Sequence, residues 1–185
     1  MIHKMNENDW EAMLSVHLTA NFRIVKALED HIRGAAKREI VASQSASGQQ
    51  HTHQVTQRSI IIVSSTVGIH GNAGQVNYSA AKAGVVGLVK SIAKEWGQFQ
   101  IRCNAVAFGY IDTRLTRTPE NVSLGDKSIT LGIPGGISHN IIQNMIPLRR
   151  LGSAHEAAGA ILLLVSPFAS YITGQVLEVD GGVAM

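Results

Sequence analysis

Three side chains in the middle of this chain have the types and spacing needed for proton transfer: Ser65, Tyr78 and Lys82. Ser65 follows the apolar run from Ser59 to Ser64, which is typical of a strand buried on both faces of a parallel sheet. Open α/β folds bind ligands at the ends of such strands. Tyr78 and Lys82 are four residues apart, so on a helix they lie on one face, one turn from each other. The three groups are therefore candidates for one catalytic site.

A tyrosine beside a lysine ammonium is a candidate general acid or base. A phenol titrates at about pH 10, and a neighbouring ammonium favours the phenolate form. Such a phenol can exchange a proton with a reacting group. The Ser65 hydroxyl can donate to a carbonyl oxygen on which charge develops, whereas hydride has to come from a cofactor. On spacing alone, chance or surface packing explains a Tyr-x-x-x-Lys pair more often than catalysis does.

The surrounding pattern alternates between amphipathic helices and short buried strands. Helices are expected over 8–32, 75–98 and 153–166, and strands over 59–64, 101–107 and 175–180. Asn8 and Glu11 resemble a helix cap, and Ser153 with Glu156 forms the S-x-x-E pattern of a capping box. The alternation predicts a doubly wound parallel α/β sheet in a single domain over residues 1–185.

Two segments interrupt this alternation. Residues 34–58 are rich in polar residues and are interpreted as an insertion loop, either functional or disordered. Its His51 and His53 could ligate a metal, but no third ligand lies at a recognisable spacing, so two solvated histidines are favoured and no metal site is predicted. The segment from Phe108 to Pro147 is predicted to be irregular. An irregular segment that follows a strand usually lies over the ligand crevice.

Composition excludes several classes of protein. The chain has 185 residues, 45% of them hydrophobic, and a formal charge of +3. Its basic residues are dispersed among acids, which disfavours nucleic-acid binding. No apolar run reaches the roughly 20 residues that a membrane helix needs. The single cysteine, Cys103, allows no internal disulfide and is expected to be a buried, inert thiol, so a cytoplasmic location is the default expectation.

Long stretches of the sequence resemble the short-chain dehydrogenase/reductase family. The matching text runs I-V-S-S-T-V-G-I-H-G-N-A-G-Q-V-N-Y-S-A-A-K-A-G from Ile62 to Gly84, with Ser65 thirteen residues before Tyr78. Two further blocks agree: R-C-N-A-V-A-F-G-Y-I-D-T from Arg102 to Thr113, and the segment from Arg150 to Gly182. The similarity covers most of the chain outside residues 34–58, and is greatest to the 3-oxoacyl-carrier-protein-reductase-like members.

The resemblance implies a Rossmann-like fold, a cofactor and roles for individual residues. The cofactor would be NADP or NAD, and the reaction hydride transfer between it and a small-molecule carbonyl or secondary alcohol. Ser65, Tyr78 and Lys82 would be catalytic; Tyr78 and Lys82 would also contact the cofactor, together with Gly109, Ile111 and Thr113. Lys82 would reach the nicotinamide ribose. The family also implies a homo-dimer or homo-tetramer.

The chain departs from the family pattern in three places. The glycine-rich turn that seats the cofactor pyrophosphate has no counterpart, so the first strands of the fold are expected to be missing. His17 stands where the family offers an asparagine in a proton relay, and could serve as a relay or be a half-buried histidine with no catalytic duty. Phe108 replaces a proline before Gly109. A truncated or non-catalytic relative that acts as a binding or assembly partner is therefore the alternative hypothesis.

Overall fold

A parallel three-stranded sheet forms the centre of the molecule. The computed structural model describes residues 1–45, 56–124, 127–132 and 135–184. Strands β1 (Arg58–Ser65), β2 (Ile101–Phe108) and β7 (Val176–Val179) lie in the order β1-β2-β7, all parallel. The register pairs Ser65 with Phe108, and Phe108 with Val179, so the three strands end together. The predicted α/β class with a parallel sheet is confirmed.

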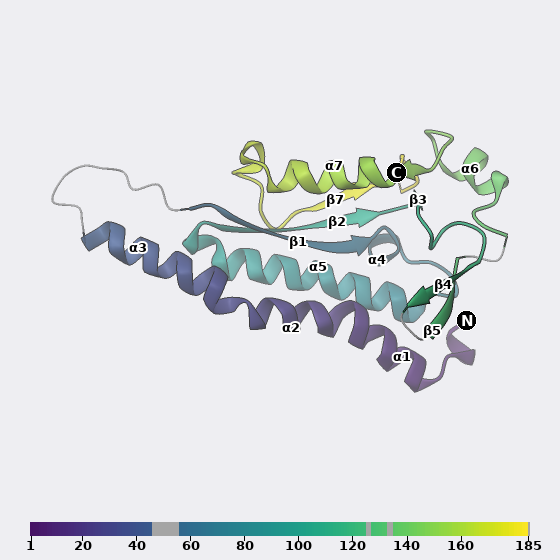
Figure 1. Cartoon of the computed structure of the whole chain (residues 1–185), viewed down its shortest axis with the longest axis horizontal. Helices are drawn as coiled ribbons and strands as arrows, with labels where there is room; N and C mark the ends of the chain where they lie inside the picture. Colours follow the sequence, from purple (N-terminus) through teal and green to yellow (C-terminus); the bar gives the residue numbers. More distant parts are fainter. Residues whose placement is uncertain (46–55, 125–126, 133–134, 185) are drawn as a thin grey trace.

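Helices cover both faces of this sheet, as Figure 1 shows. Helix α5 (Val76–Trp96) packs against β1 and β2 on one face, and α7 (Ala154–Val165) contacts the same strands from the other. Because β2 is covered on both sides, its residues from Ile101 to Ala107 are all buried. Coverage by helices on both faces therefore explains the continuous apolar run from which the buried strand was predicted.

Helix α5 forms because its apolar residues recur at helical spacing and meet the sheet. Ala81, Val85, Val89 and Ile92 are all buried and lie on one face of the helix. Val85, Val89 and Ile92 join Ile62, Cys103 and Ala105 of the strands in a single core cluster. Helical residues at this spacing bury one stripe, and the removal of that stripe from water is the main force that fixes the helix on the sheet.

A long, irregular helical segment forms the outer layer on the α5 side. It runs through α1 (Glu7–Leu14), the π-helical turn η2 (Ser15–Thr19), α2 (Ala20–Ala27), the π-helical turn η3 (Asp30–Gly34) and α3 (Ala35–Ser45). The expected helix over 8–32 is confirmed in its main part, with a break near Leu28. Its N-cap is Asn6, whose side chain accepts the Asp9 N–H, so the expected cap at Asn8 is wrong.

The expectation of a loop over 34–58 is wrong for residues 35–45, which form α3. The polar composition of the segment predicted a loop. Its Ala, Lys, Arg and Glu residues are nevertheless strong helix formers, and they favour the helix that the structure shows. Ala36 is buried in the core, and Glu39 forms an ion pair with Arg58 of β1, which ties the helix to the sheet. Residues 46–55, including His51 and His53, lie outside the described residues.

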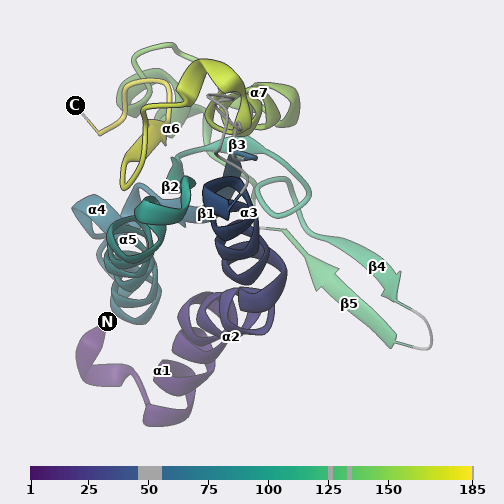
Figure 2. The same ribbon diagram turned by 90° about the vertical axis from the view of Figure 1, so that its left-hand side faces the viewer.

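The remaining short elements follow the ends of the main strands. They are η1 (Ile2–Lys4), α4 (Val67–His70), η4 (Gly97–Phe99), β3 (Ile111–Asp112), β4 (Glu120–Leu124), β5 (Lys127–Leu131), α6 (His139–Met145), β6 (Gly152–Ser153) and η5 (Pro167–Ala169). Strands β4 and β5 pair as an antiparallel hairpin that projects from the body in Figure 2. The segment from Phe108 to Pro147 is therefore more ordered than expected.

The capping box expected at the start of α7 is confirmed. The Ser153 hydroxyl accepts the Glu156 N–H at 3.1 Å, and the Glu156 carboxylate accepts the Ser153 N–H at 2.8 Å. Among the described helices, none is both long and apolar enough to cross a bilayer.

Candidate active site at the ends of β1 and β2

Ser65 is held at the point where β1 ends. Its side chain is buried, and its hydroxyl donates to the Phe108 carbonyl of β2 at 3.3 Å while it accepts the Val67 N–H of α4 at the same distance. The hydroxyl thus lies between the ends of two neighbouring strands, which is where a parallel sheet presents side chains to a ligand. The predicted place of Ser65 at this edge of the sheet is confirmed.

Tyr78 and Lys82 lie one turn apart near the start of α5, as their spacing predicted. The Lys82 Nζ atom lies 5.7 Å from the centroid of the Tyr78 ring. It donates to the Val63 carbonyl of β1 at 2.9 Å, and the residue is only 7% exposed. This burial lowers the pKa of Lys82. Within the described part of the chain no hydrogen bond reaches the Tyr78 hydroxyl, and the residue is half-buried.

Close backbone packing fixes the start of α5 against β1 and α4. An added Cβ at Gly68 would lie 2.6 Å from the Lys82 Cβ, so only glycine fits there. The Ser64 hydroxyl donates to the Lys82 carbonyl at 3.0 Å. On the other side, the Asn77 amide donates to the Asp9 carbonyl of α1 at 3.1 Å. These contacts set the position of the tyrosine and lysine relative to the strand end.

His17 contacts the same pair from the outer helical layer. Its ring lies edge-on to the Tyr78 ring, with centroids 5.1 Å apart and an angle of 87° between the planes. Burial, and secondly the charge of Lys82, lower the pKa of His17. The structure thus brings His17, Tyr78 and Lys82 together, although they come from two different helices.

Gly109, Ile111 and Thr113 follow directly after β2. The Gly109 N–H donates to the Val179 carbonyl at 3.1 Å, and an added Cβ would lie 2.6 Å from the Asp180 Cβ. Phe108, which stands in place of the family's proline, is paired with strands on both sides. The sheet therefore supplies a restraint on this backbone that the sequence alone did not reveal.

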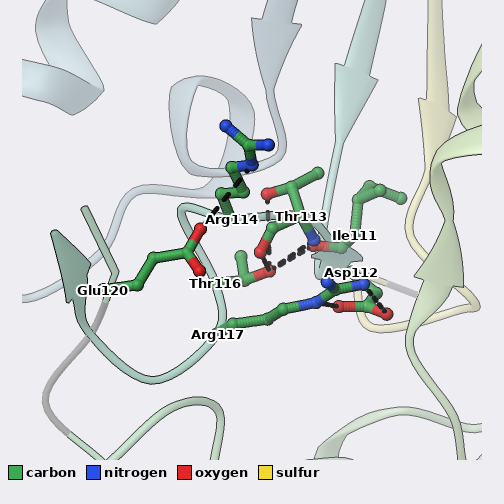
Figure 3. A network of polar contacts seen from close by, with 7 residues as sticks. All are labelled: Ile111, Asp112, Thr113, Arg114, Thr116, Arg117 and Glu120. Atoms are coloured by element: carbon green, nitrogen blue, oxygen red, sulfur yellow. Dashed lines mark hydrogen bonds and ion pairs between the residues drawn. The ribbon is translucent and has the colours of Figure 1, made fainter. Parts of the chain in front are cut away.

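Thr116, which sequence reasoning missed, organises the loop that contains Ile111 and Thr113 (Figure 3). Its hydroxyl donates to the Ile111 carbonyl at 2.6 Å and accepts the Thr113 N–H at 2.9 Å. Threonine hydroxyls commonly bind backbone groups a few residues away, so the pattern Thr113-x-x-Thr116 was a usable signal. Beyond it, Arg117 contacts both oxygens of Asp112, at 2.7 and 3.0 Å.

Comparison with known proteins identifies the family. A family model described as Enoyl-(Acyl carrier protein) reductase matches residues 49–184. The chain belongs to the short-chain dehydrogenase/reductase family. It is 36% identical over its whole length to 3-oxoacyl-acyl-carrier-protein reductase FabG of Vibrio cholerae, and 35% identical to FabG of Thermotoga maritima. Acetoacetyl-CoA reductase of Synechocystis is 37% identical over 96% of the chain.

The chain spans only part of the length of these short-chain dehydrogenase/reductase relatives. It covers 62% of the Vibrio protein, 61% of the Thermotoga protein and 60% of the Synechocystis protein. The segments that carry the family motifs, from Ile62 to Gly84 and from Arg102 to Thr113, lie within the matched range.

Gly109, Ile111 and Thr113 are the residues that would hold the nicotinamide half of a dinucleotide. A carboxamide needs a donor and an acceptor; the Ile111 carbonyl, which also accepts the Thr116 hydroxyl, and the Thr113 hydroxyl would meet it, and Gly109 is packed closely on Asp180. Within the described residues we find no glycine-rich turn from a strand into a helix for the pyrophosphate. Gly71 and Gly74 have positive φ angles and belong to the loop before α5.

Cys103 is buried in the core, as expected. This burial raises the pKa of the Cys103 thiol to about 12, in line with the expectation of an unreactive thiol. Among the described residues there is no group of metal-ligating side chains.

Proposed function

We propose that the protein is an oxidoreductase that transfers hydride between NAD(P)(H) and a carbonyl or secondary alcohol. The observation that carries this proposal is the Lys82 ammonium buried against the Tyr78 ring, beside the end of β1 where Ser65 lies. A tyrosine–lysine pair of this kind in a short-chain dehydrogenase/reductase supports proton transfer coupled to hydride transfer. NADP and NAD both remain candidates, because the residues that distinguish them in such folds follow the second strand.

Each side chain has a separate task in carbonyl reduction. The bound cofactor supplies hydride to the carbonyl carbon. Ser65 donates a hydrogen bond to the carbonyl oxygen and holds it in place, while Tyr78 gives that oxygen a proton. Lys82, held by the Val63 carbonyl, places a positive charge where the phenolate forms. The backbone at Ile111 and the hydroxyl of Thr113 would hold the nicotinamide carboxamide.

We take the proposed substrate class from the relatives' names. Two are reductases of a 3-oxoacyl or acetoacetyl thioester, and a dog protein named (3R)-3-hydroxyacyl-CoA dehydrogenase is 35% identical over 98% of the chain. A 3-oxoacyl thioester and its 3-hydroxy product are therefore the first pair to assay.

As in the family, a homo-dimer or homo-tetramer is proposed. The highly exposed side chains of Phe168 and Tyr171 support an interface near η5, and light scattering tests the oligomeric state. A cytoplasmic location stays a prediction.

Cofactor binding is the first experiment. NADPH or NADH is titrated into the purified chain and the cofactor fluorescence is followed. Saturable binding that weakens in a Thr113→Val variant is the expected result, with Thr130→Val on the hairpin as a control. Absence of any binding at millimolar cofactor contradicts the proposal for this polypeptide.

A further inference from the structure

The short helix α4 is the piece of backbone that contacts both Ser65 and Lys82. Its Val67 N–H donates to the Ser65 hydroxyl at 3.3 Å. One residue later, Gly68 packs so closely on α5 that an added Cβ would lie 2.6 Å from the Lys82 Cβ. A shift of α4 would therefore move the Ser65 hydroxyl and the Lys82 side chain relative to each other.

A helix as short as α4 cannot hold its own position. It has four residues, and its backbone bonds run from the His70 N–H to the Thr66 carbonyl and from the Gly71 N–H to the Val67 carbonyl, both at 2.9 Å. A single turn is unfavourable in isolation, because the entropy of fixing its backbone exceeds the gain from so few hydrogen bonds. Contacts with the rest of the fold therefore have to keep α4 in place.

One such contact joins the last residue of α4 to β7, the strand at the far side of the sheet. The His70 Nε2 atom lies 2.7 Å from a carboxylate oxygen of Glu178. An ionised carboxylate can only accept, so the Nε2–H donates whether or not the imidazole is charged. The two side chains are 43% and 34% exposed, so solvent weakens the pair and its expected effects are modest.

The register of the sheet explains how Glu178 reaches α4. Ser64, Ala107 and Glu178 lie side by side on β1, β2 and β7. Residues paired laterally in this way point to the same face of a sheet. The Ser64 hydroxyl contacts the Lys82 carbonyl, so this row faces α4 and α5. Ala107 is small and fully buried, so no long side chain of β2 separates Glu178 from α4.

We propose that His70 and Glu178 are positioning residues for the site at the end of β1. The inference rests on the proposed function, because only catalysis makes the relative position of Ser65 and Lys82 matter. The pair acts through the backbone of α4 and not on the reacting atoms. Its hydrogen bond ties the end of α4 to the sheet, while the Val67 N–H ties the start of α4 to Ser65. With both ends held, the Ser65 hydroxyl and the Lys82 ammonium keep a fixed separation.

Kinetic variants separate positioning from a general loss of stability. His70→Ala and Glu178→Ala should each lower kcat about fivefold, the most that a partly exposed pair supports, with KM changed less than twofold. The double variant should be no slower than either single variant, because both remove the same contact. His70→Gln offers an amide N–H at a similar reach and should restore kcat to within twofold of wild type. Wild-type kcat in either alanine variant, additive losses in the double variant, or a glutamine variant as slow as alanine overturns the inference.

An exposed ion pair away from the site supplies the matched control. Asp30 on η3 and Arg38 on α3 pair at 3.0 Å, and Figure 1 shows α3 well away from α4 along the longest axis of the molecule. Asp30→Ala removes a pair of the same kind and should leave kcat unchanged. A fall in kcat equal to that of His70→Ala would mean that such pairs act only through overall stability, and would overturn the inference.

Hydrogen exchange followed by NMR tests the attachment of α4 without turnover. In His70→Ala the amides of Val67 and Gly71 should exchange about fivefold faster than in wild type, because α4 opens more easily. The amide of the buried Val89 in α5 should exchange at the wild-type rate. Unchanged exchange at Val67 and Gly71 overturns the inference. If the chain shows no turnover with either cofactor, the proposed function fails, and the exchange rates still show whether the pair holds α4.

Discussion

The start of α5 and the hairpin β4–β5 are held in place in opposite ways. Around Tyr78 and Lys82, glycine contacts, buried hydrogen bonds and core side chains fix the backbone from several directions. The hairpin has exposed side chains along most of its length and is linked to the loop before it by an exposed ion pair between Arg114 and Glu120, at 3.6 Å. Figure 2 shows the hairpin projecting away from the sheet and its helices.

The buried start of α5 is suited to holding catalytic side chains, whereas the exposed hairpin is not. A reaction that depends on proton transfer requires side chains placed within a few tenths of an ångström, and burial provides that precision. A projecting hairpin tolerates change, because exposed ion pairs contribute little to stability. We therefore expect substitutions near α5 and β2 to have large effects and matched substitutions on the hairpin to have small ones.

The largest expected effect is on catalysis, from Tyr78→Phe. The variant removes one hydroxyl and keeps the ring, so turnover should fall about a thousandfold, within the range for loss of an acid or base, while cofactor affinity changes little. Steady-state kinetics with a 3-oxoacyl thioester measure this. Deletion of the hairpin residues 120–131 serves as the comparison and should retain measurable turnover. A Tyr78→Phe variant with wild-type kcat would mean that another group transfers the proton.

The next effect is on stability, from Asn104→Ala. Asn104 is fully buried in β2; its amide donates to the Ile172 carbonyl at 2.8 Å and its oxygen accepts the Gln175 N–H at 3.0 Å. Removal leaves buried groups unsatisfied, so the free energy of unfolding should fall by about 3 kcal/mol. Urea denaturation measures it. The hairpin control Asn121→Ala, whose side-chain oxygen accepts a hydrogen bond from the exposed Thr130, should cost less than about 0.5 kcal/mol. Equal losses would contradict the comparison.

A smaller effect is expected on cofactor affinity, from Thr116→Val. The hydroxyl of Thr116 holds both Ile111 and Thr113, so its loss should loosen the nicotinamide loop and raise the Kd for NAD(P)H about fivefold, the equivalent of one hydrogen bond. Fluorescence titration gives the Kd, and thermal unfolding shows whether the fold is intact. An unchanged Kd would place the carboxamide elsewhere.

The smallest effect concerns the exposed cap of α7 and its pH dependence. Arg150 and Ser153 lower the pKa of Glu156 to about 2. Because this folded-state pKa lies below the unfolded value, the stabilisation is present above the unfolded pKa and is lost as pH falls toward about 2. Glu156→Gln should thus be slightly less stable than wild type at neutral pH and equally stable in strong acid. Acid titration followed by circular dichroism measures both curves, and a difference that grows toward low pH would show that the sign is wrong.

The parts of the fold that the sequence predicted are those governed by burial. The strands at Ile101 to Ala107 and Ser59 to Ser64, and the helix that carries Tyr78, were found because their apolar residues follow the periods that a covered sheet requires. Ser65 was expected at a strand end and Tyr78 and Lys82 on one helix for the same reason, and the structure has them on β1 and α5; their catalytic roles stay predictions. The capping box at Ser153 was found because its local pattern matches one specific hydrogen-bond arrangement.

The parts that were missed depend on competing local signals or on tertiary contacts. Helix α3 was mistaken for a loop because its neighbours in sequence are polar, while its attachment through Glu39 to Arg58 joins distant residues. The cap at Asn6 lay two residues before the expected Asn8 because both asparagines suit a cap. Thr116 has no apolar period to mark it; its spacing from Thr113 was the available signal, and its contact with the Ile111 carbonyl requires the folded loop.

The most direct measurement follows the hydride itself. NADPH and NADH that carry deuterium at the transferable position are incubated with the purified chain and a 3-oxoacyl thioester, and the product is analysed by mass spectrometry. Deuterium at the carbon of the new hydroxyl group in the wild-type reaction, and its loss in Tyr78→Phe, is the predicted result. Unlabelled substrate recovered unchanged with both cofactors would contradict the assignment of this polypeptide as a hydride-transferring enzyme.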